Sequence, residues 1–299
     1  MLDEWPLHRI LGVGSALGRV ILGRQTAGRA ATIFENDIFL VSYPRSGNTW
    51  IRFLLGNLLH PDDPTTFRNI ESRVAEVHFN PDHKLRRLRR PRLLKSHEAF
   101  HPGYPRIIYV VRDPRDVAVS FYHHNIKARN ISDDYPIDDF VTRFIHAEFD
   151  PWWGSWGDNV MSWLAMRENH SSFLLLRYED MQENTHRELL KIASFLAAAG
   201  FPAFDISNAT LNRAIELSSP SRMRQLERDQ ARGYAQLRHT RLDKPFVRTA
   251  RCGGWKGVLS KSSVAAIEAA WAPAMQKLGY KLTACTEQEN PRHSDAVSR

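Results

Sequence analysis

Short apolar runs alternate along the chain with stretches in which apolar residues recur every three or four positions. The runs cover residues 38–41, 93–97, 106–111 and 173–177, and they are typical of buried strands. The periodic stretches predict amphipathic helices, for example over residues 137–149. Strands that alternate with helices predict an α/β fold in which helices flank a mainly parallel central sheet.

The first strand leads directly into a polar loop and then into a helix. Pro44 and Gly47 end the apolar run, and from Thr49 onward apolar residues follow at helical spacing. The backbone N–H groups of the loop 42–48 would therefore gather at a helix N-terminus, which is a favourable place for an anion. We expect a single P-loop-like domain with an anion cradle, although an ordinary strand–turn–helix with a packing glycine is the alternative.

The loop matches the nucleotide-binding pattern GxxxxGKS/T only in part. Gly47 and Thr49 match, but Ser42 replaces the first glycine and Asn48 replaces the lysine, while the cation lies inside the loop as Arg45. The lysine of that pattern reaches the terminal phosphates, and its hydroxyl residue holds Mg²⁺. We therefore expect a phosphate-like group to bind here without a metal.

Polar side chains also follow the next two apolar runs. Lys95 and His97 end one predicted strand, and Arg112 follows the other, with Ser120 two helical turns later. Open α/β sheets bind ligands at the carboxyl ends of their strands. We expect Arg112 and Ser120 to bind one anion, or alternatively Arg112 to pair with Asp113 or Asp116.

The formal net charge of the 299-residue chain is +8, which favours anionic partners without choosing among them. The basic run Lys84–Arg92 would suit a nucleic-acid-binding protein, but it lacks interleaved aromatic residues, so we expect a solvated rim and no nucleic-acid partner. Two cysteines, Cys252 and Cys285, form no disulfide framework, and this favours a reducing compartment such as the cytoplasm.

The chain divides into a predicted N-terminal helical extension over residues 1–36, one domain over 37–283 and a disordered tail over 284–299. The apolar stretch 10–22 is too short to span a bilayer, and membrane contact through it is only an alternative. The polar segment Ser218–Ala250 predicts a long surface loop. We expect Ser262 to cap the last helix and Pro273 to kink it.

Three tryptophans and two glycines crowd the segment Phe149–Gly157, FDPWWGSWG. This aromatic density would suit either the wall of an acceptor pocket or a structural corner.

These motifs together resemble sulfotransferases of the cytosolic type, which use 3′-phosphoadenosine 5′-phosphosulfate (PAPS) as sulfuryl donor. The resemblance covers about residues 38–256. The matching segments are YPRSGNTW (43–50), LLKSH (93–97), VVRDPRDVAVSFYH (110–123), RYEDMQENTHREL (177–189) and RTARCGGWK (248–256). It implies transfer of a sulfuryl group from PAPS to a hydroxyl or amine, with 3′-phosphoadenosine 5′-phosphate (PAP) as product and no metal.

The resemblance also implies site residues. His97 would be the general base, and Lys95 and Arg45 would stabilise charge during transfer. The residues expected to hold the donor are Arg45, Ser46, Gly47, Asn48, Thr49, Trp50, Arg112, Ser120, Tyr178, Ser218, Arg248, Thr249, Ala250 and Arg251. The acceptor would be a small molecule, a lipid or a carbohydrate.

The chain departs from the family pattern at several of these positions. Arg45 replaces a lysine, Thr249 and Ala250 replace the last two residues of an RKG triplet, Gly254 replaces an aspartate and Asn159 replaces a histidine. The dimerisation motif of the family is absent, so the oligomeric state stays open. A P-loop nucleotide kinase and a PAPS-binding relative without catalysis are the alternatives.

Overall fold

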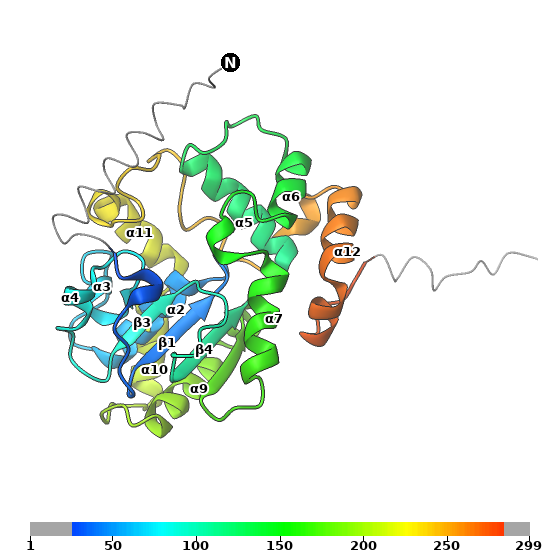
Figure 1. The fold of residues 1–299 in the computed structure, drawn as a ribbon. Helices are drawn as coiled ribbons and strands as arrows, with labels where there is room; N and C mark the ends of the chain where they lie inside the picture. The colour runs from blue at the N-terminus through cyan, green and yellow to red at the C-terminus, as the bar shows by residue number, and fades with distance from the viewer. Residues whose placement is uncertain (1–25, 284–299) are drawn as a thin grey trace, which may run out of the picture.

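A computed structural model describes residues 26–283 of the chain. Within them, five parallel strands form one sheet in the order β2-β3-β1-β4-β5, so the expected α/β architecture is confirmed (Figure 1). The strands are β1 (Ile38–Ser42), β2 (Ala75–Glu76), β3 (Leu93–Ser96), β4 (Arg106–Val111) and β5 (Phe173–Arg177). The α-helices are α2 (Asn48–Leu59), α3 (Ile70–Arg73), α4 (Asp82–Leu85), α5 (Pro114–Lys127), α6 (Ile137–Ile145), α7 (Trp156–Arg167), α8 (Tyr178–Glu183), α9 (Thr185–Ala198), α10 (Asn208–Leu217), α11 (Pro220–Gln230) and α12 (Lys261–Lys277). Short 3-10 helices are η1 (Gly28–Ala30), η2 (Pro151–Trp153), η3 (Ala231–Gly233) and η4 (Gly254–Gly257).

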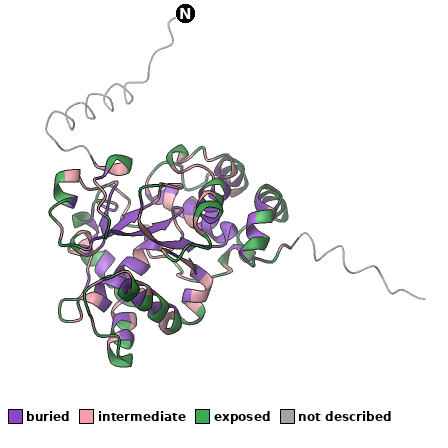
Figure 2. Ribbon diagram, turned by 60° about the horizontal axis from the view of Figure 1, so that its bottom comes forward, coloured by how far each residue is buried: buried purple, intermediate pink, exposed green. Residues whose placement is uncertain are grey.

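The central strand β1 is buried along its whole length because helices cover both faces of the sheet. Side chains alternate between the faces of a strand, so Ile38 and Leu40 enter one core and Phe39 and Val41 enter the other. The first core also holds apolar residues of α2, α9 and α10, and the second those of α5, α6, α7 and α12. Figure 2 shows the buried strands between these two layers.

The order of the strands creates a crevice at their carboxyl ends. The chain places β3 on one side of β1 and then crosses to place β4 on the other side. Val41 is level with Ser96, and Ser42 is level with Val110, so the three strands end together. This switch point is where open α/β sheets bind ligands.

The prediction of a surface loop over Ser218–Ala250 is wrong. The segment contains α11, and its sparse apolar residues form a third core against Phe53 and Phe67. The residues buried there are Met223, Leu226, Ala231, Tyr234, Leu237 and Phe246. Arginines separate these residues in the sequence, which hides the helical pattern. Strand β2 was also not predicted, because it has only two residues.

The last helix is capped two residues earlier than predicted. Ser260 caps α12, because its side chain accepts a hydrogen bond from the N–H of Ser263, while Ser262 lies inside the helix. The predicted kink is confirmed, since Trp271 leaves helical geometry with φ −136° two residues before Pro273.

The basic run Lys84–Arg92 is only partly a solvated rim. Leu85 and Arg92 are buried, and Arg92 forms an ion pair with Asp37, which is equally buried.

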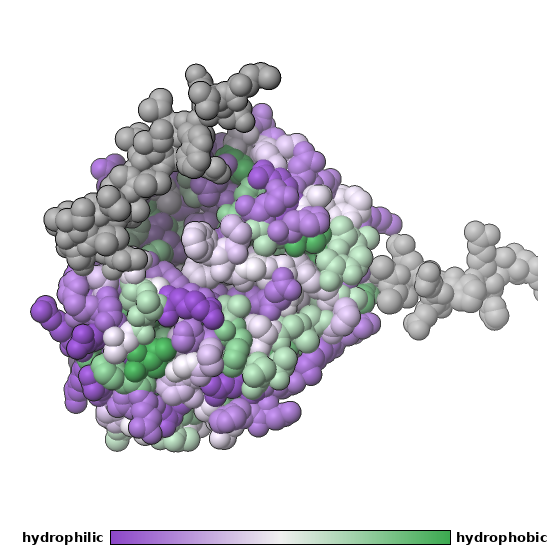
Figure 3. Space-filling view, in the orientation of Figure 1, coloured by the Kyte–Doolittle hydropathy of each residue, from purple (hydrophilic) through white to green (hydrophobic). Residues whose placement is uncertain are grey.

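On the face of the molecule shown in Figure 3, hydrophobic residues occur in small groups separated by hydrophilic ones.

Some of the predictions concern residues outside the described part. The predicted tail over 284–299, the apolar stretch 10–22 and Cys285 all lie there, and Cys252 forms no disulfide with any residue between 26 and 283. Of the predicted extension over residues 1–36, residues 26–36 contain only the 3-10 turn η1. Between residues 26 and 283 no helix combines the length and the hydrophobicity that a bilayer crossing requires.

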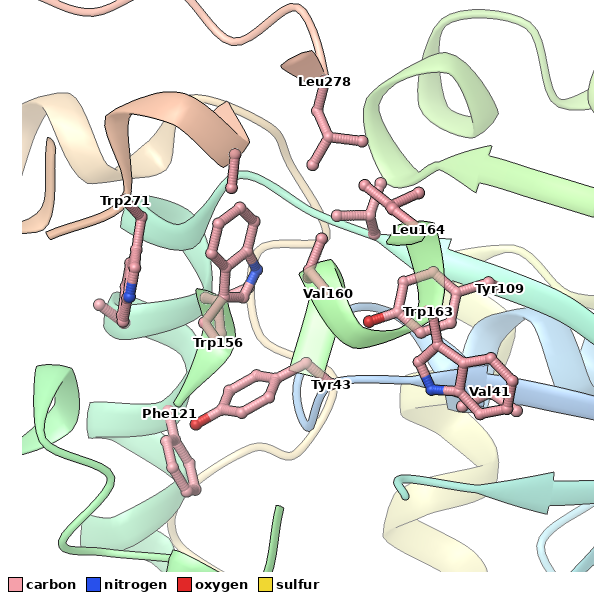
Figure 4. Close-up of a cluster of buried hydrophobic side chains, with 14 of the residues drawn as sticks. Val41, Tyr43, Tyr109, Phe121, Trp156, Val160, Trp163, Leu164, Trp271 and Leu278 are labelled. Carbon is pink, nitrogen blue, oxygen red and sulfur yellow. The ribbon is translucent and has the colours of Figure 1, made fainter. Parts of the chain in front are cut away.

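Aromatic residues of α7 pack tightly against the kinked helix α12. Figure 4 shows Trp156 between Trp271 and Tyr43, and the ring centres of Trp156 and Trp271 are 5.4 Å apart. Gly157 makes this contact possible, because a Cβ atom there would lie 2.5 Å from Cδ1 of Trp271.

We therefore expect Gly157→Ala to lower the free energy of unfolding by about 1–3 kcal/mol, the usual cost of overpacking. Thermal unfolding measures this change. Gly233→Ala is the matched control, since nothing lies within 4 Å of the position that its added Cβ atom would take. Equal stability of the two variants would contradict the packing argument.

Candidate active site

The loop after β1 turns sharply into α2. Gly47 is the N-cap of α2 with φ 98°, and Arg45 is also left-handed with φ 69°. A Cβ atom on Gly47 would lie 2.4 Å from Cδ2 of Tyr178, so the turn requires glycine for two reasons. Asn48 Nδ2 donates a hydrogen bond to Ser42 Oγ (3.0 Å) and joins the two ends of the loop.

A cavity of about 490 Å³ opens where this loop meets the ends of β3 and β4. Most of the predicted site residues line it together. They are Arg45, Gly47, Asn48, Thr49, Trp50, Lys95, His97, Arg112, Ser120, Tyr178, Arg248, Thr249 and Ala250. This volume suits a small-molecule site.

Three predicted residues do not line the cavity. Ser46 is fully buried, and Arg251 is exposed and contributes only its carbonyl oxygen, which accepts a hydrogen bond from Arg112 Nη2 (3.1 Å). Ser218 is also fully buried, and its Oγ accepts from Asn57 Nδ2 (2.9 Å), so it joins α10 to α2.

Three guanidinium groups surround one end of the cavity. Arg45 Nε donates to Ser120 Oγ (3.3 Å), and Arg112 Nη1 donates to the carbonyl oxygen of Arg45 (3.3 Å). Burial, followed by the charges of Arg112 and Arg248, lowers the pKa of Arg45 to about 10. Burial and Arg112 also lower the pKa of Arg248. Arg112 is buried and the other two arginines are half-buried, and such a cluster of like charges favours a bound anion.

Arg112 does not form the alternative ion pair with Asp113 or Asp116. Asp113 pairs with Arg115, and Asp116 accepts hydrogen bonds from the N–H groups of Gly253 (2.7 Å) and Trp255. Instead, the Arg112 guanidinium lies 4.3 Å from the centre of the Tyr178 ring. That ring meets Trp50 edge to face at 5.6 Å. Aromatic surface thus adjoins the cations, as a nucleotide base and its phosphates require.

His97 lies at the other end of the cavity with a defined tautomer. Its Nδ1 is 2.7 Å from the carbonyl oxygen of Ser42, and because a carbonyl only accepts, Nδ1 carries the proton. Nε2 therefore keeps its lone pair. Burial, followed by the charge of Lys95, holds the pKa of His97 well below its ordinary value. The neutral imidazole can therefore accept a proton.

Lys95 is held by a carboxylate that sequence reasoning missed. It pairs with Glu76 of β2, and both side chains are almost fully buried. Burial lowers the pKa of Lys95 to about 8, although Glu76 opposes that shift. Burial likewise raises the pKa of Glu76. The ends of β2 and β3 thus place a hydrogen-bonded pair of ionisable groups in the cavity wall.

Asn159, which departs from the family pattern, is a positioning residue. Its Nδ2 donates to the carbonyl oxygens of His97 (3.0 Å) and Trp153 (3.2 Å), and its Oδ1 accepts from Tyr109 Oη (2.8 Å). The aromatic segment Phe149–Gly157 contains η2 and the start of α7, and within it Asp150 and Trp153 line the cavity. The segment therefore has two roles: part of it lines the cavity, and Trp156 is a buried core residue that forms a structural corner.

Other lining residues gave no signal in the sequence. His78, Phe79 and His124 reach the cavity from short or irregular segments and from the far end of α5. In the part of the chain that the structure describes, no group of three or more histidine, cysteine or acidic residues is placed to hold a metal ion.

Comparison with known proteins agrees with this geometry. A family model described as sulfotransferase domain matches residues 35–279. Human sulfotransferase 2B1 is 28% identical over 260 residues, which are 81% of this chain and 67% of that protein. Cytosolic sulfotransferase 12 of Arabidopsis thaliana is 30% identical over 252 residues, 76% of this chain and 74% of the relative.

Solved structures show the same fold at lower identity. Mouse sulfotransferase SULT7A1 complexed with PAP superposes with TM-score 0.67 at 22% identity and covers 88% of this chain and 92% of its own. Retinol dehydratase in complex with androsterone and PAP gives TM-score 0.68 at 18% identity, with 89% and 88% covered.

We expect Gly47→Ala to raise the Kd of PAP by at least about tenfold, because a side chain there is strained and displaces Tyr178. Isothermal titration calorimetry with PAP measures the change. Gly257→Ala, with nothing within 4 Å of the added Cβ, is the control. Unchanged affinity in Gly47→Ala would show that the turn is not part of the binding site.

Proposed function

The chain belongs to the sulfotransferase domain family and is a PAPS-dependent sulfotransferase, and we propose that His97 removes the proton from the hydroxyl group of a small-molecule acceptor. The observation that carries this proposal is the hydrogen bond from His97 Nδ1 to the Ser42 carbonyl, which leaves Nε2 free in the cavity. Ser42 is the last residue of β1 and begins the cationic loop. One short segment thus positions the proposed base beside the donor site.

The residues fit the donor in charge and in shape. Arg45, Arg112 and Arg248 supply positive charge at the cavity wall, and Trp50 with Tyr178 supplies aromatic surface for the adenine. Ser120, through its hydrogen bond with Arg45, connects the 5′ and 3′ anion positions that the resemblance implies. PAP in the neighbouring solved structures supports the same assignment.

Transfer then needs a base and charge stabilisation. In the proposed reaction the acceptor oxygen forms a bond to sulfur, the bond between sulfur and the bridging oxygen of PAPS breaks, and the acceptor proton moves to His97 Nε2. The Ser42 carbonyl stabilises the imidazolium through Nδ1–H. Lys95 and Arg45 stabilise the charge that grows on the sulfuryl and bridging oxygens, as in phosphoryl transfer.

The acceptor class follows from the relatives only in coarse form. Structures of retinol dehydratase contain retinol or androsterone, and these bound molecules support a small-molecule acceptor here. We further propose that residues 37–283 form the sulfotransferase domain and that the protein works in the cytoplasm, as the name of the Arabidopsis relative suggests. A nucleotide kinase is disfavoured because Asn48 stands where its lysine is needed.

We expect His97→Gln to reduce kcat by about 10²–10⁴, the usual contribution of a general base. Transfer of label from radiolabelled PAPS to an uncharged phenol measures this loss. The Kd of PAP should change less than about threefold, because the donor contacts other residues. His170→Gln, an exposed histidine outside the cavity, is the control.

The pH profile tests the protonation state of the same residue. A base must be deprotonated to act, and the lowered pKa of His97 means that protonation occurs only below its ordinary range. With an uncharged phenol, kcat/KM should therefore stay level down to about pH 6.5 and fall only at lower pH. If His97→Gln keeps most of the turnover of the unmodified protein, His97 has a structural role and is not the base.

We also expect PAPS to bind at least about 100-fold more tightly than adenosine 5′-phosphosulfate, which lacks the 3′-phosphate. Charge-assisted hydrogen bonds contribute about 1.5–3 kcal/mol each, and Arg112 and Ser120 are assigned to this phosphate. Calorimetry measures both constants. Arg112→Gln should reduce the difference, and equal affinity for the two donors in the unmodified protein would refute the assignment.

A further inference from the structure

A carboxylate that forms no ion pair within the described residues 26–283 lies in the wall of the cavity near His97. Asp150 immediately precedes η2 and lines the cavity. Its Oδ2 accepts a hydrogen bond of 2.6 Å from Trp153 Nε1. No lysine, arginine or histidine within residues 26–283 forms an ion pair with it, although nearby Glu148 pairs with Arg143.

The indole of Trp153 connects Asp150 to the reacting end of the site. The ring centre of Trp153 is 5.7 Å from that of His97 and 4.5 Å from that of His78. The edge of the indole thus positions the carboxylate, and its ring packs beside the proposed base. A ligand with its hydroxyl group at His97 Nε2 can therefore reach Asp150 with another group.

A second carboxylate contributes to this wall. Glu76 is fully buried and lines the cavity, and while its Oε1 pairs with Lys95, its Oε2 has no hydrogen-bond partner. The charge of Lys95 acts on Asp150 from a distance and lowers its pKa, but Lys95 is already paired with Glu76, so within residues 26–283 Asp150 has no cation at ion-pair distance. Burial raises the pKa of Asp150 to about 6, which leaves the carboxyl group ionised at neutral pH. The acceptor end is therefore acidic, whereas the donor end is basic.

We propose that Asp150 binds an ammonium group of the acceptor, and that the substrates are alcohols or phenols that carry a primary amine. This inference rests on the proposed function, since it names the acceptor class for the same site. A partly desolvated carboxylate gains most from a ligand that brings an opposite charge and N–H donors. The Trp153 ring adds a favourable surface for a cation.

The chemistry of transfer agrees with this division of roles. A protonated amine has no lone pair and cannot attack sulfur, so binding at Asp150 keeps the amine unreactive and leaves the hydroxyl group as nucleophile. The hydroxyl proton moves to His97 Nε2, and the ammonium group keeps all of its protons. The products are the sulfate ester of the acceptor, an amino alcohol or a phenol with an aminoalkyl group, and PAP.

Matched acceptors test the inference. Tyramine carries an ammonium group where para-propylphenol, of nearly the same shape, carries a methyl group, and meta-aminomethylphenol with meta-ethylphenol forms a shorter pair. Radiolabelled PAPS supplies kcat/KM for each acceptor. In at least one pair, the unmodified protein should prefer the cationic member by about tenfold or more.

The variant Asp150→Asn keeps the size of the side chain and removes its charge. It should lower kcat/KM for the preferred cationic acceptor by about 10–100-fold and change that of the uncharged partner by less than about threefold. Glu148→Gln is the matched control, because it removes a carboxylate two residues away that pairs with Arg143 outside the cavity. This control variant should leave kcat/KM unchanged for both acceptors.

The outcomes separate this inference from the proposed function. If Asp150→Asn lowers kcat/KM equally for both members of a pair, or if the unmodified protein prefers the uncharged phenols, the role of Asp150 is overturned while sulfuryl transfer itself stands. If no phenol is sulfated, calorimetry of tyramine with the protein–PAP complex decides the inference. Binding that Asp150→Asn abolishes would support it, and absence of binding would overturn it. Failure of the protein to bind PAP would instead refute the donor assignment.

Discussion

The parallel pairing of β1 with β3 and β4 is the constraint on which the site depends. Because these strands end level with one another, the loop after β1, His97 after β3 and Arg112 after β4 meet at a single crevice. A slip of one residue in either pairing would turn every side chain of the slipped strand to the other face of the sheet. The two cores oppose such a slip, since β1 contributes buried apolar residues to both.

Opposite charges divide the resulting cavity into two ends. Arg45, Arg112 and Arg248 gather at the end proposed for the donor, where burial and the neighbouring cations lower the pKa of Arg45 and of Arg248. Asp150 and Glu76 lie at the acceptor end. The arginine cluster and the Asp150 carboxylate do not favour folding, because burying a charge without an opposite partner costs free energy. The surrounding aromatic and aliphatic packing offsets that cost in free energy. A ligand group of opposite charge would then pair with each buried charge and stabilise it.

Local patterns predicted most of the frame, and contacts between distant segments account for what they missed. The apolar runs marked β1, β3, β4 and β5, and the loop with Gly47 was recognisable because a turn into a helix has a local signature. The burial of Met223, Leu226 and Tyr234 depends on Phe53 and Phe67, more than 150 residues earlier, so the segment looked like a loop. Glu76 and Asp150 gave no signal because their meaning comes only from the cavity that they line.

Ser218 shows a different limit of sequence reasoning. The resemblance placed it among the donor-binding residues, whereas in the structure its hydroxyl group joins α10 to α2 and does not line the cavity. A motif match transfers a residue type and a spacing, whereas the direction of a side chain depends on neighbours such as Asn57.

The basicity of His97 is coupled to the donor site through charge. Burial is the main cause of the lowered pKa of His97, and the charges of Lys95 and Arg45, which line the same cavity, lower it further. An anion bound between them would cancel part of their field and raise that pKa toward its ordinary value. The imidazole would thus be a weak base before the donor binds and a stronger one afterwards, so that proton abstraction follows assembly of the ternary complex. Asn159, which holds the His97 carbonyl, and Ser42, which accepts from Nδ1, keep the ring in place while its charge changes.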